Sequence, residues 1–169
     1  PNVTHPWHVW TQWHTADNGT YNYGVPLEFA LDGNVLNLQV LGHYFDSIHC
    51  YKENITCGYL WTTPLKKGVW YDILLHVKWS TRTDGLVEGR IKLIGINGTN
   101  EVDQIQTYHG NTLNNLSNAT TDDKKVYLKQ GLYRNNSIHV NQVLYHDGMI
   151  IAECQVNTTF DPDTEKCVS

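Results

Sequence analysis

Residues 70–80 read WYDILLHVKWS and form the longest stretch of the chain with a two-residue period. One face would carry Ile73, Leu75, Val77 and Trp79, and the other Leu74, His76 and Lys78. Because successive side chains of a strand point to opposite faces, this alternation predicts a β-strand with one buried face. No stretch sustains the 3.6-residue period of a helix. The sequence therefore indicates an all-β protein.

Turn sequences on both sides of this strand predict antiparallel hairpins. Asp84-Gly85 leads into a predicted strand over 86–94, and Asp32-Gly33-Asn34 joins predicted strands over 28–31 and 35–41. Gly and Asn accept the positive φ that tight hairpin turns require. Further strands are predicted over 7–14, 127–134, 138–145 and 149–154, with a long exposed loop over 107–125.

About ten such strands with polar residues at alternate positions are typical of two sheets packed face to face. The predicted fold is a jelly-roll-like β-sandwich of two antiparallel sheets. We find no domain boundary and expect residues 1–169 to form one domain.

Eight Asn-x-Ser/Thr sequons occur in the chain, whereas roughly two are expected by chance from its composition. They begin at Asn2, Asn18, Asn54, Asn97, Asn115, Asn118, Asn135 and Asn157. This excess predicts an N-glycosylated protein of the secretory pathway, in the Golgi lumen or outside the cell. Because the sequence opens at Pro1 without a leader, we expect a targeting segment to have been removed.

The four cysteines form an even set without a Cys-x-x-Cys pair, which favours disulfides in an oxidising compartment. The predicted pairs are Cys50 with Cys57 and Cys154 with Cys167. Zinc ligation by the four thiolates is the alternative, although structural zinc sites use two closely spaced pairs.

The formal net charge is −5, with 12 Lys and Arg against 17 Asp and Glu. No basic block is present that could attract nucleic acid. No apolar run reaches the length of a membrane span. We therefore expect neither nucleic-acid binding nor a membrane span, and we expect a monomer.

Two predicted strands each carry functional side chains on one face: Trp10, Gln12 and His14 on the first, and Lys129, Gly131 and Tyr133 on the second. If the faces meet across a sheet, they suit proton abstraction next to a carboxylate. His14 would remove the proton, Gln12 or Lys129 would stabilise the enolate, and Tyr133 would return a proton. The alternative is an ordinary solvent-wetted sheet face.

Five motifs follow one another along most of the chain: Gln12-Trp13-His14, VKWS at 77–80, Asp84-Gly85, YLKQGLYR at 127–134 and Tyr145-His146-Asp147. In this order they resemble the jelly-roll polysaccharide lyases related to heparin and glucuronan lyases. The resemblance implies a two-sheet sandwich and a uronic-acid polymer as substrate. It also places His14 and Tyr133 at the positions of the family's proton-transfer pair.

The sequon density and the sandwich pattern also resemble the manganese-dependent peroxidases linked to anhydrobiosis in tardigrades. That resemblance implies a Golgi-resident enzyme that uses Mn²⁺ to remove hydrogen peroxide during desiccation stress. The chain lacks a haem attachment signature and a reactive cysteine with a resolving partner, which leaves a metal held by carboxylate and imidazole groups.

Asp84 and Asp147 are the predicted manganese ligands and catalytic residues. Both stand in Asp-Gly steps at the ends of predicted strands, where a carboxylate can project from a tight turn. Mn²⁺ favours carboxylate oxygen, and Zn²⁺ or Ca²⁺ could occupy the same site. The alternative is that each Asp-Gly step only makes a hairpin turn.

The main functional prediction is therefore a manganese-dependent peroxidase that acts on hydrogen peroxide. One alternative is a polysaccharide lyase that acts by β-elimination through Gln12, His14, Lys129 and Tyr133. Another is a carbohydrate-binding module without chemistry, in which Trp10 and Tyr133 stack on sugar rings.

Overall fold

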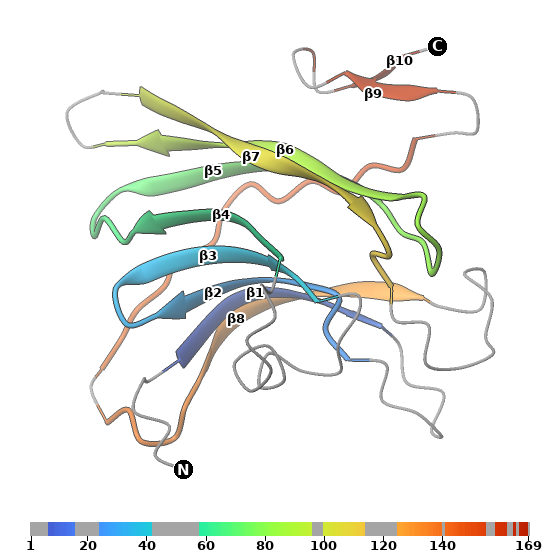
Figure 1. The fold of residues 1–169 in the computed structure, drawn as a ribbon. Coiled ribbons are helices and arrows are strands. Elements are labelled where there is room, and N and C mark those ends of the chain that lie inside the picture. Colours follow the sequence, from blue (N-terminus) through green and yellow to red (C-terminus); the bar gives the residue numbers. More distant parts are fainter. Residues whose placement is uncertain are drawn as a thin grey trace.

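Two antiparallel sheets face one another in the computed structural model of the chain (Figure 1). The structure describes residues 7–15, 24–41, 58–95, 100–113, 125–139, 141–154, 158–161, 164 and 166–168. One sheet has five strands in the order β4-β3-β2-β1-β8, and the other has three in the order β5-β6-β7. The predicted all-β sandwich is confirmed. No helix among the described residues is long and apolar enough to cross a membrane.

The five-stranded sheet contains the first hairpin predicted from the sequence. Its strands are β1 (Trp7–Thr15), β2 (Leu27–Asp32), β3 (Val35–Val40), β4 (Gly58–Pro64) and β8 (Val126–Arg134). Gly33 connects β2 to β3 with a φ of 60°, a value that a side chain would disfavour. Leu27, Phe29 and Leu31 of β2 all point toward the opposite sheet and are buried.

The three-stranded sheet is built around the stretch WYDILLHVKWS. Its strands are β5 (Trp70–Lys78), β6 (Gly85–Ile94) and β7 (Asn100–Gly110). Leu75, Val77 and Trp79 are partly buried and pack against the core, whereas Ile73 of the same predicted face is 38% exposed. A short hairpin of β9 (Thr159–Asp161) and β10 (Lys166–Val168) completes the described strands.

The core lies between the two sheets and draws on both. Leu27, Leu36 and Leu38 come from the five-stranded sheet, and Val87 and Ile91 from the three-stranded one. Each of these five side chains is almost completely buried. Full burial of such a side chain stabilises the fold by about 1.5–3 kcal/mol, so this layer holds the two sheets together.

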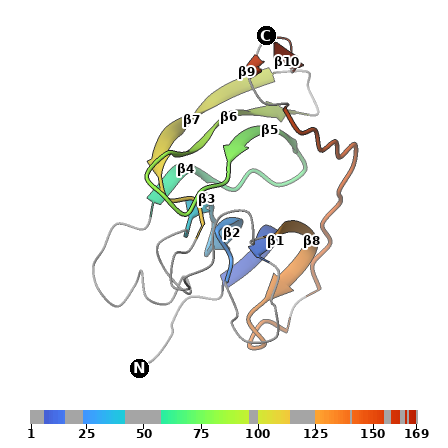
Figure 2. The same cartoon turned by 90° about the vertical axis from the view of Figure 1, so that its right-hand side faces the viewer.

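The two edges of the sandwich differ. On one side β4 packs against β7. On the other side, the edge strands β5 and β8 are spanned by residues 141–154, here called the crossing segment, which runs from the end of β8 toward β9 (Figures 1 and 2). Part of this segment lines a cavity of about 500 Å³ between the sheets, together with residues of β5, β1 and β8.

The structure of the crossing segment shows that two strand predictions are wrong. The sequence alternates over 138–145 and 149–154, but residues 138, 139 and 141–154 form no strand. Val143, Tyr145, Ile150 and Ile151 are all largely exposed, so the segment has no buried face that would select a sheet position. The predicted loop over 107–125 is also wrong at its start, because β7 continues through Gly110.

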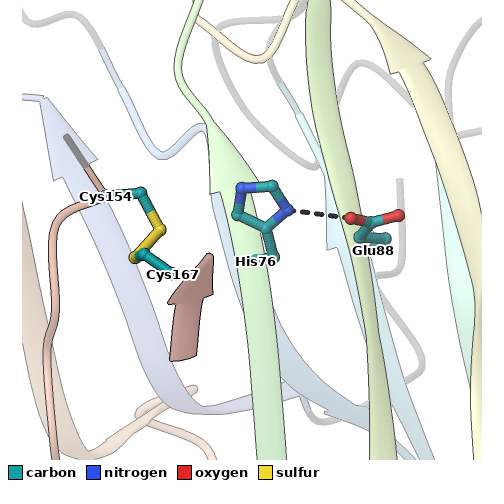
Figure 3. Close-up of a disulfide and its surroundings, with 4 residues drawn as sticks. All are labelled: His76, Glu88, Cys154 and Cys167. Atoms are coloured by element: carbon teal, nitrogen blue, oxygen red, sulfur yellow. Dashed lines mark hydrogen bonds and ion pairs between the residues drawn. A yellow bond between two sulfur atoms is a disulfide. The ribbon is translucent and has the colours of Figure 1, made fainter. Parts of the chain in front are cut away.

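The predicted disulfide between Cys154 and Cys167 is present (Figure 3). It joins the end of the crossing segment to β10. Cys50 and Cys57 lie outside the described residues. Of the eight predicted sequons, Asn135 lies in the described part, in the turn after β8, where its Oδ1 accepts a hydrogen bond from the Ser137 backbone N–H at 2.8 Å. The other seven lie outside it: Asn2, Asn18, Asn54, Asn97, Asn115, Asn118 and Asn157.

Candidate active site on the five-stranded sheet

A β-bulge in β1 decides which side chains this strand presents on each face. The register between β1 and β2 shifts between Val9 and Thr11, and Trp10 has no Cα partner on β2. Its side chain packs against the core and meets the ring of Tyr71 edge-on, with centroids 6.4 Å apart. The bulge turns the Trp10 side chain toward the core, although Trp10 also lines a cleft together with Gln12 and His14. The stacking of Trp10 on sugar stays a prediction.

A row of polar side chains crosses the other face of the sheet. In register from β8 to β4, its members are Lys129, Gln12, Glu28, Gln39 and Tyr59. Glu28 lies between Leu27 and Phe29, which point into the core, so the row lies on the face away from the three-stranded sheet. Inside the row, Gln12 Nε2 donates a hydrogen bond to Glu28 Oε2 at 3.1 Å.

One cleft brings together all four residues of the lyase alternative. Gln12 and His14 of β1 and Lys129 and Tyr133 of β8 all line a cleft of about 570 Å³. These residues are far apart in the sequence and meet because β1 and β8 pair in the sheet. The cleft therefore combines an imidazole, an ammonium group, an amide and a phenol, the set of groups that the sequence predicted for proton abstraction.

His14 lies in surroundings that favour its neutral form. Its ring is 5.7 Å from that of Tyr127, centroid to centroid, and the Lys129 ammonium lies 5.4 Å from the Tyr127 centroid. Burial, and next the positive charge of Lys129, lower the pKa of His14 from its ordinary value. A neutral imidazole can accept a proton near neutral pH, so His14 is suited to act as a base.

Tyr133 and Glu28 occupy opposite environments at this site. Tyr133 is 62% exposed and pairs with Val9 across the strands, which leaves its phenol accessible to a ligand in the cleft. Glu28 is only 4% exposed, and this burial raises its pKa, while the hydrogen bond from Gln12 acts in the opposite direction. Sequence analysis missed Glu28, because a single carboxylate within LEFALD gives no sign that it will be buried.

The predicted metal ligands Asp84 and Asp147 are in different surroundings. Asp84, in the turn between β5 and β6, accepts hydrogen bonds from the Ser80 hydroxyl and, at 3.0 Å, from the Lys78 ammonium. The Ser80 and Lys78 hydrogen bonds lower the pKa of Asp84. Asp147 lines the cavity between the sheets, which Asp84 does not.

These surroundings do not fit a manganese site at Asp84. A divalent cation there would have to displace the ammonium group that already neutralises the carboxylate. Among the described residues, no group of three or more His, Cys, Asp and Glu side chains is placed to hold a metal ion. The carboxylate pair stays a prediction, and we derive no reaction step from it.

Comparison with known proteins gives one match. A family model described as polysaccharide lyase matches residues 1–150, which include every strand of the two sheets and the four cleft residues. Neither the comparison with curated proteins nor the comparison with solved structures gives a match. Nothing in these comparisons supports the resemblance to manganese-dependent peroxidases. The chain belongs to the polysaccharide lyase family.

Proposed function

We propose that the protein cleaves a uronic-acid polysaccharide by β-elimination, with the cleft on the five-stranded sheet as its active site. One observation carries the proposal: in a chain of the polysaccharide lyase family, a base, a cation, an amide and a phenol line a single cleft. Each group has a role in removing a proton next to a carboxylate and expelling the neighbouring sugar.

The proposed reaction begins with the uronate carboxylate bound by Lys129 and Gln12. These two donors withdraw electron density from the carboxylate and make the neighbouring C5 proton more acidic. His14 removes this proton, and the electron pair left on C5 forms the C4–C5 double bond. The C4–O bond breaks and its electrons go to the leaving oxygen, which takes a proton from the Tyr133 hydroxyl. One chain then ends in an unsaturated uronate and the other in a free hydroxyl.

Lys129 serves this reaction in two ways. Its charge stabilises the additional negative charge that develops on the carboxylate as the C5 proton leaves. The same charge helps to lower the pKa of His14 and so keeps the base unprotonated. The lowered pKa makes His14 a weaker base. Stabilisation of the enolate offsets this, because a weaker base can remove a more acidic C5 proton.

The direct test is to incubate the protein with glucuronan, alginate and heparin and to follow the ultraviolet absorbance of the new double bond. We expect absorbance to grow with at least one polymer and to fail with His14→Ala and Tyr133→Phe. His76 serves as the control histidine, because it lies on β5 of the opposite sheet and bonds Glu88 instead of lining the cleft (Figure 3). Binding without any double bond would reject the lyase and favour a carbohydrate-binding module.

The proposal includes secretion. The Cys154–Cys167 disulfide supports an oxidising compartment such as the secretory lumen or the extracellular space, where polysaccharide substrates are also found. Mass spectrometry of the intact protein purified from a secreting eukaryotic host would check this, with N-linked glycan mass expected. A glycan-free, disulfide-reduced protein retained inside the host cell would contradict it.

A further inference from the structure

Glu28 is a buried carboxylate in the middle of the polar row. It lies at the centre of the five-stranded sheet on β2, with Gln12 opposite it on β1 and Gln39 opposite it on β3. Its side chain is 4% exposed and that of Gln39 is 3% exposed. Burying a carboxylate is unfavourable unless hydrogen bonds compensate for the lost water. An apolar residue of similar size would stabilise the fold better at this position. We therefore look for a function of Glu28 in its contacts with neighbouring residues.

The hydrogen bond from Gln12 provides that role. A glutamine amide carries two N–H donors on one side and one carbonyl acceptor on the other. Rotation of the amide by half a turn exchanges the two sides, and an unrestrained side chain populates both orientations. The 3.1 Å contact runs from Gln12 Nε2 to Glu28 Oε2, so the amide stands with its nitrogen toward Glu28 and the carboxylate oxygen accepts.

This orientation matters because Gln12 lies between Glu28 and the open part of the cleft. Gln12 is half-buried and faces Lys129 on its other side, in register across β1 and β8. With one N–H held by Glu28, the second N–H of the same nitrogen remains for an acceptor in the cleft. Lys129 supplies a positive charge next to that donor, and the pair forms a receptor for a carboxylate.

We propose that Glu28 is a positioning residue that orients the Gln12 amide so that Gln12 can donate to the substrate carboxylate. The inference rests on the proposed lyase function. Glu28 does not touch the substrate and acts through Gln12 alone. Its loss should therefore matter only while Gln12 is present.

A double-mutant cycle tests this dependence. We expect Glu28→Ala to lower kcat/KM on the cleaved polymer by about tenfold, the size of one hydrogen bond to a charged group. In a Gln12→Ala background the same substitution should change kcat/KM by less than about twofold, because the group that it positions is gone. Equal losses in both backgrounds would overturn the proposal and leave Glu28 with a purely structural role.

Two further variants separate positioning from packing. Glu28→Gln keeps the size of the side chain, but its amide can donate as well as accept and no longer selects one orientation of Gln12, so it should recover only part of the activity lost in Glu28→Ala. Gln39→Met changes the other buried neighbour of Glu28 in the row and should leave kcat/KM close to that of the unsubstituted protein. If Glu28→Gln is as active as the unsubstituted protein, or if Gln39→Met is as impaired as Glu28→Ala, packing at this position matters and the orientation of Gln12 does not.

The cycle also distinguishes failure of the inference from failure of the proposed function. If the unsubstituted protein forms no double bond, the lyase proposal falls, and the same four proteins are compared by their affinity for polyglucuronate. A coupling between Glu28 and Gln12 in binding would then support the positioning role without chemistry. If the unsubstituted protein neither cleaves nor binds polyglucuronate, both proposals are overturned.

Discussion

The outer faces of the two sheets differ in how deeply their polar side chains are buried. On the five-stranded sheet, the outer face of β2 and β3 carries Glu28, Asn37 and Gln39, and all three are buried. On the three-stranded sheet, the outer face of β5 and β6 carries the pair His76–Glu88, joined at 2.8 Å, with both side chains partly open to solvent (Figure 3). In the part of the chain whose burial is described, these three polar residues of the five-stranded sheet are withdrawn from water, whereas His76 and Glu88 are not.

This difference shows which sheet carries buried polar groups, whose burial is unfavourable without hydrogen bonds. A polar pair that keeps its access to water contributes little to stability and requires no special packing. Buried amides and a buried carboxylate require hydrogen bonds in fixed directions, and fixed directions are what a catalytic site needs. The cleft lined by His14 and Lys129 belongs to the sheet that meets this requirement.

The sharpest test of this contrast substitutes one histidine on each sheet. We expect His14→Ala to lower kcat for polymer cleavage by about a thousandfold, because a positioned general base contributes 10²–10⁴. His76→Ala should leave kcat within about twofold, since a partly exposed side chain of the opposite sheet has no role in proton transfer. Steady-state ultraviolet assays measure both. Similar losses for the two variants would place the base elsewhere.

Stability should separate the sheets as well. We expect Leu38→Ala on β3 to lower the free energy of unfolding by about 3 kcal/mol, because it leaves a cavity in a fully buried site. Ile73→Ala on β5 should lower it by only about 1 kcal/mol, because Ile73 is already 38% exposed. Urea unfolding of both variants gives the two values. Equal values would mean that the open edge is packed as tightly as the centre.

The disulfide offers a smaller perturbation at the periphery. Cys154→Ser combined with Cys167→Ser opens a loop with a sequence separation of 13 and should lower stability by about 2 kcal/mol. Hydrogen exchange should speed up in β9 and β10 and stay unchanged in β2 and β3. Faster exchange throughout the five-stranded sheet would show that the crossing segment supports the active-site sheet.

The smallest expected effect is a shift in pH dependence. Lys129→Met removes one of the two causes that lower the pKa of His14, so this pKa should rise toward its ordinary value. The unprotonated base is then formed at higher pH, and the acid limb of the kcat/KM profile should move upward in pH. Lys78→Met on the other sheet should not move it. An acid limb that moves downward or not at all would contradict the role of Lys129.

The regular parts of the fold could be predicted from the sequence, and the irregular parts could not. The alternation over 70–80 and the turn at Gly33 correctly predicted β5 and the β2–β3 hairpin, because each is a local signal. The inward turn of Trp10 could not be foreseen, since a bulge depends on pairing with β2 and β8. The crossing segment was predicted as strands because its residues alternate between apolar and polar. Such alternation does not show whether a neighbouring strand is available for pairing.

The candidate site shows the same limit. Gln12, His14, Lys129 and Tyr133 could be grouped from their spacing, and they do line one cleft. The role of Glu28 could not be predicted from the sequence, because neighbours on other strands bury its side chain. For Asp84, an Asp-Gly step shows that a carboxylate is available for a turn, but it does not show that Lys78 and Ser80 each donate a hydrogen bond to one of its oxygens.

The pairing of β1 with β8 has a consequence for how activity arises during synthesis. It aligns His8 with Arg134 and His14 with Tyr127, and so it joins the first and the last of the strands described in the two sheets. Contacts this remote in sequence close late, because the entropy of a long loop must be lost before they form. A nascent chain therefore carries half a site until its eighth strand has left the ribosome, and catalytic competence would report that folding is complete.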